Sequence, residues 1–249
     1  MKNPNLKFSI LIIASMLFLL PSAKAQLSLD IESGAVIAGY NNVRIPGDAG
    51  TLFSLTDDLK GKPTAFIRLR AGYTIKSRHT ISVLYAPLTV KSDGSTTFPI
   101  DFEGVTFPAN TPLDASYTFN SYRITYRYDF VKKPKFEFGL GFTAKIRDAE
   151  IALTSQGLAS SKTNVGFVPI INFRLNWIMN EKFGLLLEGD ALAAPQGRAE
   201  DVLLAATYKI NRKIALKAGY RILEGGADND EVYNFSLFNY ISAGAIIVF

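Results

Sequence analysis

The sequence predicts an all-β fold, a transmembrane up-and-down antiparallel β-barrel of about ten strands, with eight or twelve strands as alternatives. Three observations lead to this prediction. Apolar and polar residues alternate with the period of a β-strand along most of the chain. The alternating segments are separated by turn residues, and no apolar run after residue 25 reaches the roughly 20 residues of a spanning helix. Because lipid offers no partners to backbone amides, a closed barrel is the spanning structure that remains.

The first 25 residues have the pattern of a cleavable secretory signal peptide, and residues 26–249 are expected to form the barrel. A basic start precedes an apolar core at residues 8–20, and Ala23-Lys24-Ala25 provides a cleavage site. Removing the signal removes three lysines, so the formal charge falls from +5 to 5 − 3 = +2 and nucleic acid is not expected as a partner. The chain has no cysteine, which excludes a disulfide framework and a lipid-modified cysteine anchor.

The first five strands are expected on the basis of their alternation. In residues 27–40 an apolar face opposes Asp30 and Glu32, and in residues 64–75 it opposes Arg68 and Arg70. A third strand follows at residues 80–90, although Pro87 removes a backbone donor there and predicts a bulge or a break. The alternation is strictest in the fourth and fifth strands, where aromatic and aliphatic residues oppose charged residues, Thr and Gly; these strands are residues 122–130 and 136–147.

Five further strands complete the predicted barrel, at residues 165–177, 183–191, 202–210, 214–223 and 233–249. The first of these contains Pro169, which again predicts a bulge or a break. The last carries an apolar residue at almost every second position and ends on an aromatic residue, Phe249. Such a strand fits a wall with lipid on one side.

The nine connections fall into two alternating classes. Four are short and mostly basic, at residues 76–79, 131–135, 179–182 and 211–213. Five are longer and richer in Gly, Pro, Asp and Ser, at residues 41–62, 91–115, 148–164, 192–201 and 224–230. Short periplasmic turns and longer outer loops are typical of outer-membrane barrels, and an even strand number places both termini in the periplasm of a Gram-negative bacterium.

Seven aromatic residues are expected to face outward close to the short turns and to form a ring at the membrane interface. They are Tyr73, Phe130, Phe136, Trp177, Phe183, Tyr208 and Phe249. The opposite, charged face must line the lumen, because each Arg or Lys turned toward lipid near the midplane costs roughly 2–4 kcal/mol.

The lumen is therefore expected to hold a network of charges of both signs. Its predicted members are Asp30, Glu32, Arg68, Arg70, Arg123, Arg127, Glu137, Arg174, Glu188, Lys217 and Arg221; Asp129, Lys145, Arg147, Asp190 and Lys209 also face inward. Because ten strands leave only a narrow passage, an ion-paired plug is favoured over a conducting pore, which would prefer anions. Pairing Phe130 with Phe136 would place Arg127 opposite Gly139, and pairing Trp177 with Phe183 would place Asn172 opposite Glu188.

One outer loop is unusually apolar and reads as a hairpin around Glu103-Gly104. Its apolar residues are Phe98, Ile100, Phe102, Val105 and Phe107. We expect this hairpin to fold over or into the barrel mouth, where it restricts access, or to contact a partner or the outer leaflet.

The signal peptide, the alternating strands and the final run Ile241, Ala243, Ala245, Ile247 and Phe249 resemble those of the small bacterial outer-membrane β-barrel proteins. The resemblance covers the mature chain. It implies that Ile247 and Phe249 belong to a signal for the barrel assembly machinery, and that this machinery and the outer-membrane lipids are partners. Proteins of many functions share the pattern.

The sequence predicts no catalytic residues, metal or cofactor. Its one histidine, His79, falls in an expected periplasmic turn, and no Gly-x-Ser-x-Gly motif is present. The acidic run at residues 228–231 lacks the spacing of a dedicated calcium loop. The expected function is non-enzymatic, either a narrow passive solute pore or a structural barrel with an ion-paired lumen. A surface-binding, adhesin-like barrel is the alternative, and a lipid-modifying enzyme comes last.

Overall fold

The computed structural model of the protein describes residues 26–194 and 197–249. The expected signal peptide lies outside these residues. The described chain is all-β, as the alternation predicts. No helix among these residues is long and apolar enough to cross a membrane.

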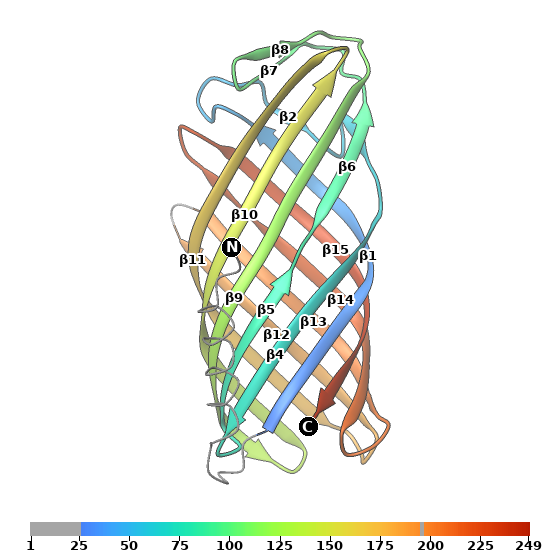
Figure 1. Ribbon diagram of the computed structural model, residues 1–249, viewed down its shortest axis with the longest axis vertical. Coiled ribbons are helices and arrows are strands. Elements are labelled where there is room, and N and C mark those ends of the chain that lie inside the picture. Colours follow the sequence, from blue (N-terminus) through green and yellow to red (C-terminus); the bar gives the residue numbers. More distant parts are fainter. Residues whose placement is uncertain (1–25, 195–196) are drawn as a thin grey trace, which may run out of the picture.

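Ten antiparallel strands close into a barrel, which confirms the predicted fold class. Figure 1 shows a tall cylinder whose strands are tilted relative to its long axis. In order around the wall they are β1 (Gln26–Arg44), β4 (Thr64–Ile75), β5 (His79–Ala86) continued by β6 (Thr89–Gly94), β9 (Leu113–Lys133), β10 (Phe136–Ser155), β11 (Leu158–Ile178), β12 (Phe183–Ala194), β13 (Gly197–Lys209), β14 (Ile214–Asp228) and β15 (Tyr233–Val248). Pairing of the first strand with the last seals the wall, with Ser28 opposite Val248.

The four connections that the sequence predicts to be short lie at one end of the barrel, which we call the short-turn end, and the five that it predicts to be longer lie at the other, the long-loop end. The long-loop end also carries four short strands: β2 (Phe53–Ser54), β3 (Leu59–Gly61), β7 (Ile100–Phe102) and β8 (Val105–Phe107). The last two form a separate hairpin, as the sequence predicts.

Both prolines mark irregular places in the wall. Pro87 and Leu88 separate β5 from β6, and the two strands keep one register against β9 because the Leu88 carbonyl still accepts a hydrogen bond from Phe119 N–H at 2.8 Å. Pro169 lies within β11, opposite Ala144 of β10. Pairing of β11 with β12 begins two residues later in the sequence, at Ile171. The missing donor therefore falls outside that pairing.

Several expected loops are strands in the structure. The expected loop at residues 148–164 is the upper part of β10 and β11, which turn tightly at Gln156-Gly157 with positive φ angles of 44° and 87°. Parts of the expected loops at residues 91–115 and 192–201 likewise extend the wall. These extensions lack the strict alternation of the rest, because neither of their faces is wholly apolar.

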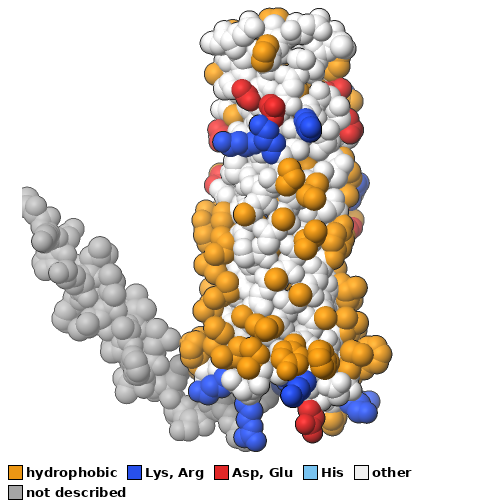
Figure 2. Space-filling view, turned by 90° about the vertical axis from the view of Figure 1, so that its right-hand side faces the viewer, with side chains coloured by type: hydrophobic (Ala, Val, Ile, Leu, Met, Phe, Trp, Pro, Cys, Tyr) orange, Lys and Arg blue, Asp and Glu red, His pale blue; other side chains and the backbone are white. Residues whose placement is uncertain are grey.

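Exposed apolar side chains cover the outside of the barrel in a broad band (Figure 2). Lys, Arg, Asp and Glu appear beyond the band at both ends in that view. The predicted aromatic ring lies at the short-turn edge of this band. There the side chains of Phe130, Trp177, Phe183 and Phe249 are each at least half exposed. A band of this extent indicates contact with lipid.

The interior differs between the two ends. Charged side chains fill the middle of the barrel, whereas buried aliphatic and aromatic side chains pack together at the long-loop end. This apolar cluster joins β1, β9 and β15 to the short strands β2, β3, β7 and β8. The outer strands and loops therefore close over the mouth as one packed layer.

Candidate functional site

A network of buried ion pairs crosses the lumen at mid-height. At its centre the Asp201 carboxylate of β13 accepts hydrogen bonds from Arg68 of β4, at 2.8 Å, and from Arg123 of β9 and Arg221 of β14. The strands β9 and β13 face each other across the barrel, because three strands separate them on one side and five on the other. The carboxylate therefore ties opposite walls together.

Four further carboxylates complete the network. Glu32 of β1 accepts two hydrogen bonds from Arg221, at 2.8 and 2.9 Å, in the bidentate arrangement that gives strong charge-assisted bonds. Lys217 of β14 lies 2.9 Å from both Asp30 and Glu32. Asp190 accepts hydrogen bonds from Arg123 at 2.6 Å, and it also accepts bonds from Thr143 and Asn172.

Glu188 of β12 pairs with two arginines on the side of the network nearer the short-turn end. Its distance to Arg70 Nη1 is 3.0 Å and its distance to Arg174 Nε is 3.8 Å. In all, six cations meet five carboxylates, namely Arg68, Arg70, Arg123, Arg174, Lys217 and Arg221 with Asp30, Glu32, Glu188, Asp190 and Asp201. A space of about 10 Å³ lies among Asp30, Glu32, Arg68, Arg70 and Arg221. We call this group the plug.

Most of the predicted lumen residues belong to the plug, but two do not. Arg127 pairs with Asp129, at 3.1 Å, beside the plug. Glu137 accepts a hydrogen bond from Asn176, and no cation among the described residues forms an ion pair with it. Asp201 was missed as a lumen residue because the sequence places it in a loop, although it accepts hydrogen bonds from three arginines.

Both predicted strand registers are wrong by two residues. Arg127 lies opposite Gly141 and not Gly139, since β9 continues to Lys133 and the pair contains a bulge at Phe138/Gly139. Arg174 lies directly opposite Glu188, and Asn172 lies opposite Asp190. A shift of two residues keeps every side chain on its predicted face, so the inward and outward assignments survive.

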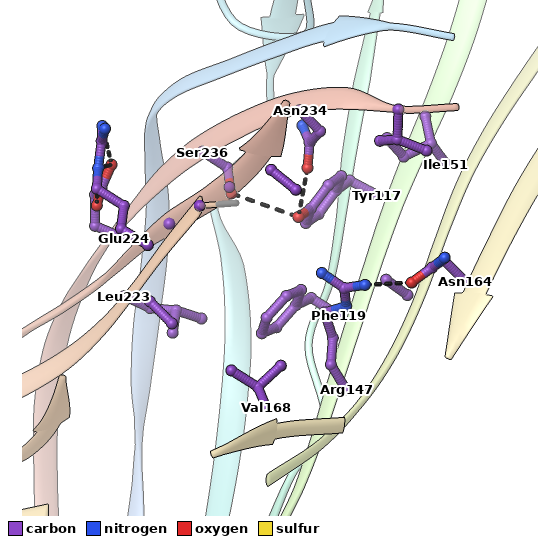
Figure 3. A pocket seen from close by; sticks show the side chains of 18 of the residues that line it. Tyr117, Phe119, Arg147, Ile151, Asn164, Val168, Leu223, Glu224, Asn234 and Ser236 are labelled. Carbon is purple, nitrogen blue, oxygen red and sulfur yellow. Dashed lines mark hydrogen bonds and ion pairs between the residues drawn. The ribbon is translucent and has the colours of Figure 1, made fainter. Parts of the chain in front are cut away.

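A cavity of about 460 Å³ lies on the long-loop side of the plug (Figure 3). Its position follows from the strands: Lys145, which lines it, lies opposite Arg123 in register, and Leu223 follows two residues after Arg221. Phe119, Ile151, Val168 and Leu223 provide apolar surface, and Tyr117, Asn164, Asn234 and Ser236 provide polar atoms. Tyr117 donates a hydrogen bond to Asn234 at 3.0 Å.

Four cations line the cavity, and they differ in their partners. Arg198 forms a bidentate pair with Glu224, and Lys162 forms an ion pair with Glu103 at 3.0 Å. Arg147 donates to the amide oxygen of Asn164, and its Nε atom is buried without a partner. Lys145 is almost fully buried, with its Nζ atom 4.7 Å from the centre of the Phe119 ring. Among the described residues, no carboxylate lies within ion-pair distance of Lys145 or Arg147.

The cavity reaches the side wall between β11 and β12. From Leu158 to Ile170, β11 pairs with β10 alone among the described strands, because its pairing with β12 begins at Ile171. Figure 1 shows the hairpin of β10 and β11 rising well beyond the hairpin of β12 and β13. Phe167, Val168 and Pro169 on one edge and Leu192 and Gly197–Ala199 on the other all line the cavity.

The mouth itself is covered by the hairpin of β7 and β8, which we call the lid. Ile100, Phe102 and Phe107 of the lid are fully buried in the apolar cluster, and Phe98 and Val105 pack against it half-buried. The Glu103 amide donates to the carbonyl of Ile45, and the Glu103 carboxylate pairs with Lys162 of β11. The apolar lid residues therefore face inward and do not form an exposed surface.

The remaining predicted residues lie at the short-turn end. His79 is the first residue of β5 and not part of the turn, and its Nδ1 atom lies 2.8 Å from the Tyr126 hydroxyl. Phe249 is exposed, and its amide donates to the carbonyl of Leu27. The role of Ile247 and Phe249 in assembly stays a prediction.

Comparison with solved structures shows the fold. The chain is similar to the outer membrane protease OmpT from Escherichia coli, with a TM-score of 0.54 and 12% identity over 90% of this chain and 97% of OmpT. The protein has the fold of the small bacterial outer-membrane β-barrels. Weaker likenesses include Ail of Yersinia pestis, with a TM-score of 0.41 and 10% identity over 90% of this chain and 99% of Ail. Another is an outer membrane channel from Pseudomonas putida F1, with a TM-score of 0.42 and 10% identity over 92% of this chain and 97% of the channel. The sequence matches no family model and no curated protein.

Proposed function

We propose that this protein is a non-enzymatic barrel of the Gram-negative outer membrane that is closed to solute flow and binds a small molecule in its outward cavity. Of the two functions that the sequence favours, the structural barrel with an ion-paired lumen suits the geometry better than the passive pore. The observation that supports this proposal most strongly is the position of the plug, which lies directly next to the cavity on its short-turn side. A molecule can occupy the cavity but finds no passage through the plug.

The physical character of the plug supports a closed lumen. Six cations against five carboxylates leave little net charge to draw ions through, and the side chains of Arg68, Arg123, Arg221, Glu32 and Asp201 are each 5% exposed or less. Opening a path would require breaking buried ion pairs, at about 3–5 kcal/mol for each partner removed. A spontaneous opening of that kind is rare.

The cavity has the composition of a binding site. Pockets that hold small ligands are concave, mostly apolar and supplied with a few polar groups, and they measure roughly 300–1,000 Å³. The lipid-facing band and the fold place the protein in a membrane, and the inferred orientation, with both termini in the periplasm, directs the long-loop end and its cavity to the outside.

Conductance in planar lipid bilayers tests the closed lumen. We expect the mature protein to insert without producing conductance steps, in bilayers where a general porin inserted as a positive control does produce them. Insertion is verified independently by recovering the protein from the bilayer lipid after flotation. Regular steps from the wild-type protein would contradict the proposal and would favour the passive pore.

A surface-binding role through the apolar outer loop has less support. Its basis in the sequence was the series of apolar side chains in the lid, and the structure packs these side chains into the interior. A partner that binds the lid would therefore meet its polar outer face, which includes Asp101 and Thr106.

A further inference from the structure

We propose that the outward cavity binds the carboxylate of a long-chain fatty acid, with Lys145 and Arg147 holding the head group and the acyl chain lying on the apolar lining. This inference rests on the proposed function and names its ligand class. Four observations carry it: the two cations without carboxylate partners, the apolar walls, the cavity volume and the opening in the wall.

The two cations are placed for one anion. Lys145 and Arg147 are two residues apart on β10, so their side chains lie on the same face of the strand and both point inward. Burying a cation without a counter-charge costs free energy. A buried donor without an acceptor, such as Arg147 Nε–H, adds to that cost. A bound carboxylate would supply the missing acceptor atoms and the missing negative charge.

The other charged groups of the lining do not fill this role. Arg198 and Glu224 satisfy each other, as do Lys162 and Glu103. Glu150 follows Arg147 by three positions on the strand and so has the opposite parity, and Glu231 is exposed on the loop after β14. The unpaired charge on the inward face of β10 is thus positive.

The apolar lining and the volume favour a single acyl chain. Phe119, Val168, Leu192, Leu223 and Phe238 are among the apolar residues that line the cavity. At about 460 Å³ the cavity lies in the lower half of the range for small-ligand pockets, which suits one chain and not the two chains of a phospholipid.

The opening between β11 and β12 gives such a molecule a path from the membrane. Val165 and Phe167 of β11 are 70% and 66% exposed beside it, so the approach is apolar. An amphiphile in the outer leaflet can reach the cavity sideways, without crossing the lid or the plug. Its charged head would then lie next to Lys145, at the end of the cavity that borders the plug.

Cysteine protection measures occupancy of the cavity directly. The chain has no native cysteine, so Val168→Cys places one thiol in the lining and Val83→Cys places a matched thiol on the outer surface of β5, away from the opening. In the full mature protein, folded in a non-ionic detergent, we expect palmitate to slow maleimide labelling at position 168 and to leave labelling at position 83 unchanged. Methyl palmitate, which has the chain without the charge, should protect only at higher concentration.

Charge variants in the Val168→Cys background test the head-group contacts. We expect Lys145→Met to raise the palmitate concentration for half-protection by at least about tenfold, because it removes a charge-assisted hydrogen bond. Lys145→Arg should retain binding. Lys209→Met is the matched control: it removes the same charge from an exposed position outside the cavity and should change nothing. Arg147→Met provides a second variant if Lys145→Met does not fold, and folding is checked by gel mobility.

The outcomes separate the two proposals. Equal protection by palmitate and methyl palmitate, or unchanged half-protection in Lys145→Met and Arg147→Met, would overturn carboxylate recognition and leave a ligand-binding cavity in place. Protection by neither compound would overturn the fatty-acid inference alone, because the proposed function requires only that some small molecule binds in the cavity. The closed lumen is judged separately by conductance.

Discussion

At the scale of single residues, the three arginines around Asp201 show how much one carboxylate holds together. Arg68, Arg123 and Arg221 come from three different strands and converge on its two oxygen atoms. Without the carboxylate, three buried guanidinium groups would face one another. Mutual repulsion and unpaired donors would then act at the same point of the barrel.

We therefore expect Asp201→Ala to destabilise the folded barrel by about 3–5 kcal/mol, the range for removing one partner of a buried ion pair. Urea-dependent unfolding of the protein in lipid vesicles measures the change. Glu137→Gln is the control, because Glu137 only accepts a hydrogen bond from Asn176 and glutamine can still accept it. A loss of less than about 1 kcal/mol in Asp201→Ala would show that the plug contributes little to stability.

Alternation in the sequence identified ten of the eleven predicted lumen residues as charged groups of an ion-paired interior, with Glu137 the exception. It could not find the hub, since Asp201 lies at the point where the alternation of β13 fades into loop-like composition. Nor could it reveal which charges pair, because period two fixes the face of a side chain but not its partner. The sequence also did not reveal the cavity, because the position of the cavity depends on where β12 ends and β13 begins.

At the scale of strands, the unequal heights of neighbouring hairpins create the opening in the wall. The hairpin of β10 and β11 turns at Gln156-Gly157, whereas β12 already ends at Ala194. The upper part of β11 thus has a free edge, which barrels generally avoid. Pro169 suits this position, since its ring has no N–H to leave unpaired.

Hydrogen exchange should reveal this free edge. Backbone amides of residues 158–168 that point away from β10 have no partner among the described strands and should exchange much faster than those of Ile171–Ile178, which pair on both sides. Residue-resolved NMR exchange of the protein in detergent micelles measures the difference. The matched stretch of β10, residues 140–154, pairs with both neighbours and should stay protected throughout. Equal protection of residues 158–168 and 171–178 would mean that the wall is closed there.

At the scale of the whole molecule, the sequence predicted the architecture well. Ten strands, their order and the side of each short turn follow from hydrophobic period and loop length, which are local signals. Strand length was underestimated wherever the wall rises beyond the apolar band, because polar surroundings on both faces remove the alternation that identifies a strand. The lid hairpin could be predicted because apolar residues flank Glu103-Gly104 on both sides. In the structure these two residues form the turn, with φ angles of 47° and 74°.

A closed barrel should stay folded in detergent unless the sample is boiled. We expect the unboiled mature protein to migrate at a different apparent mass from the boiled protein in gel electrophoresis. Removing residues 241–249 takes away much of the pairing between β15 and both of its neighbours and should abolish the difference. Removing residues 98–107, which belong only to the lid, should preserve it. Identical mobility of the wild type before and after boiling would count against a closed barrel.

The seam between β1 and β15 has a consequence for how the protein is made. The strand β1, which lies near the start of the chain, can pair with β15 only after the C-terminal residues have been synthesised. Contacts so distant along the chain form slowly, and the waiting edges are prone to aggregation. The polypeptide therefore remains an open sheet with two unpaired edges until its C-terminal strand is in place.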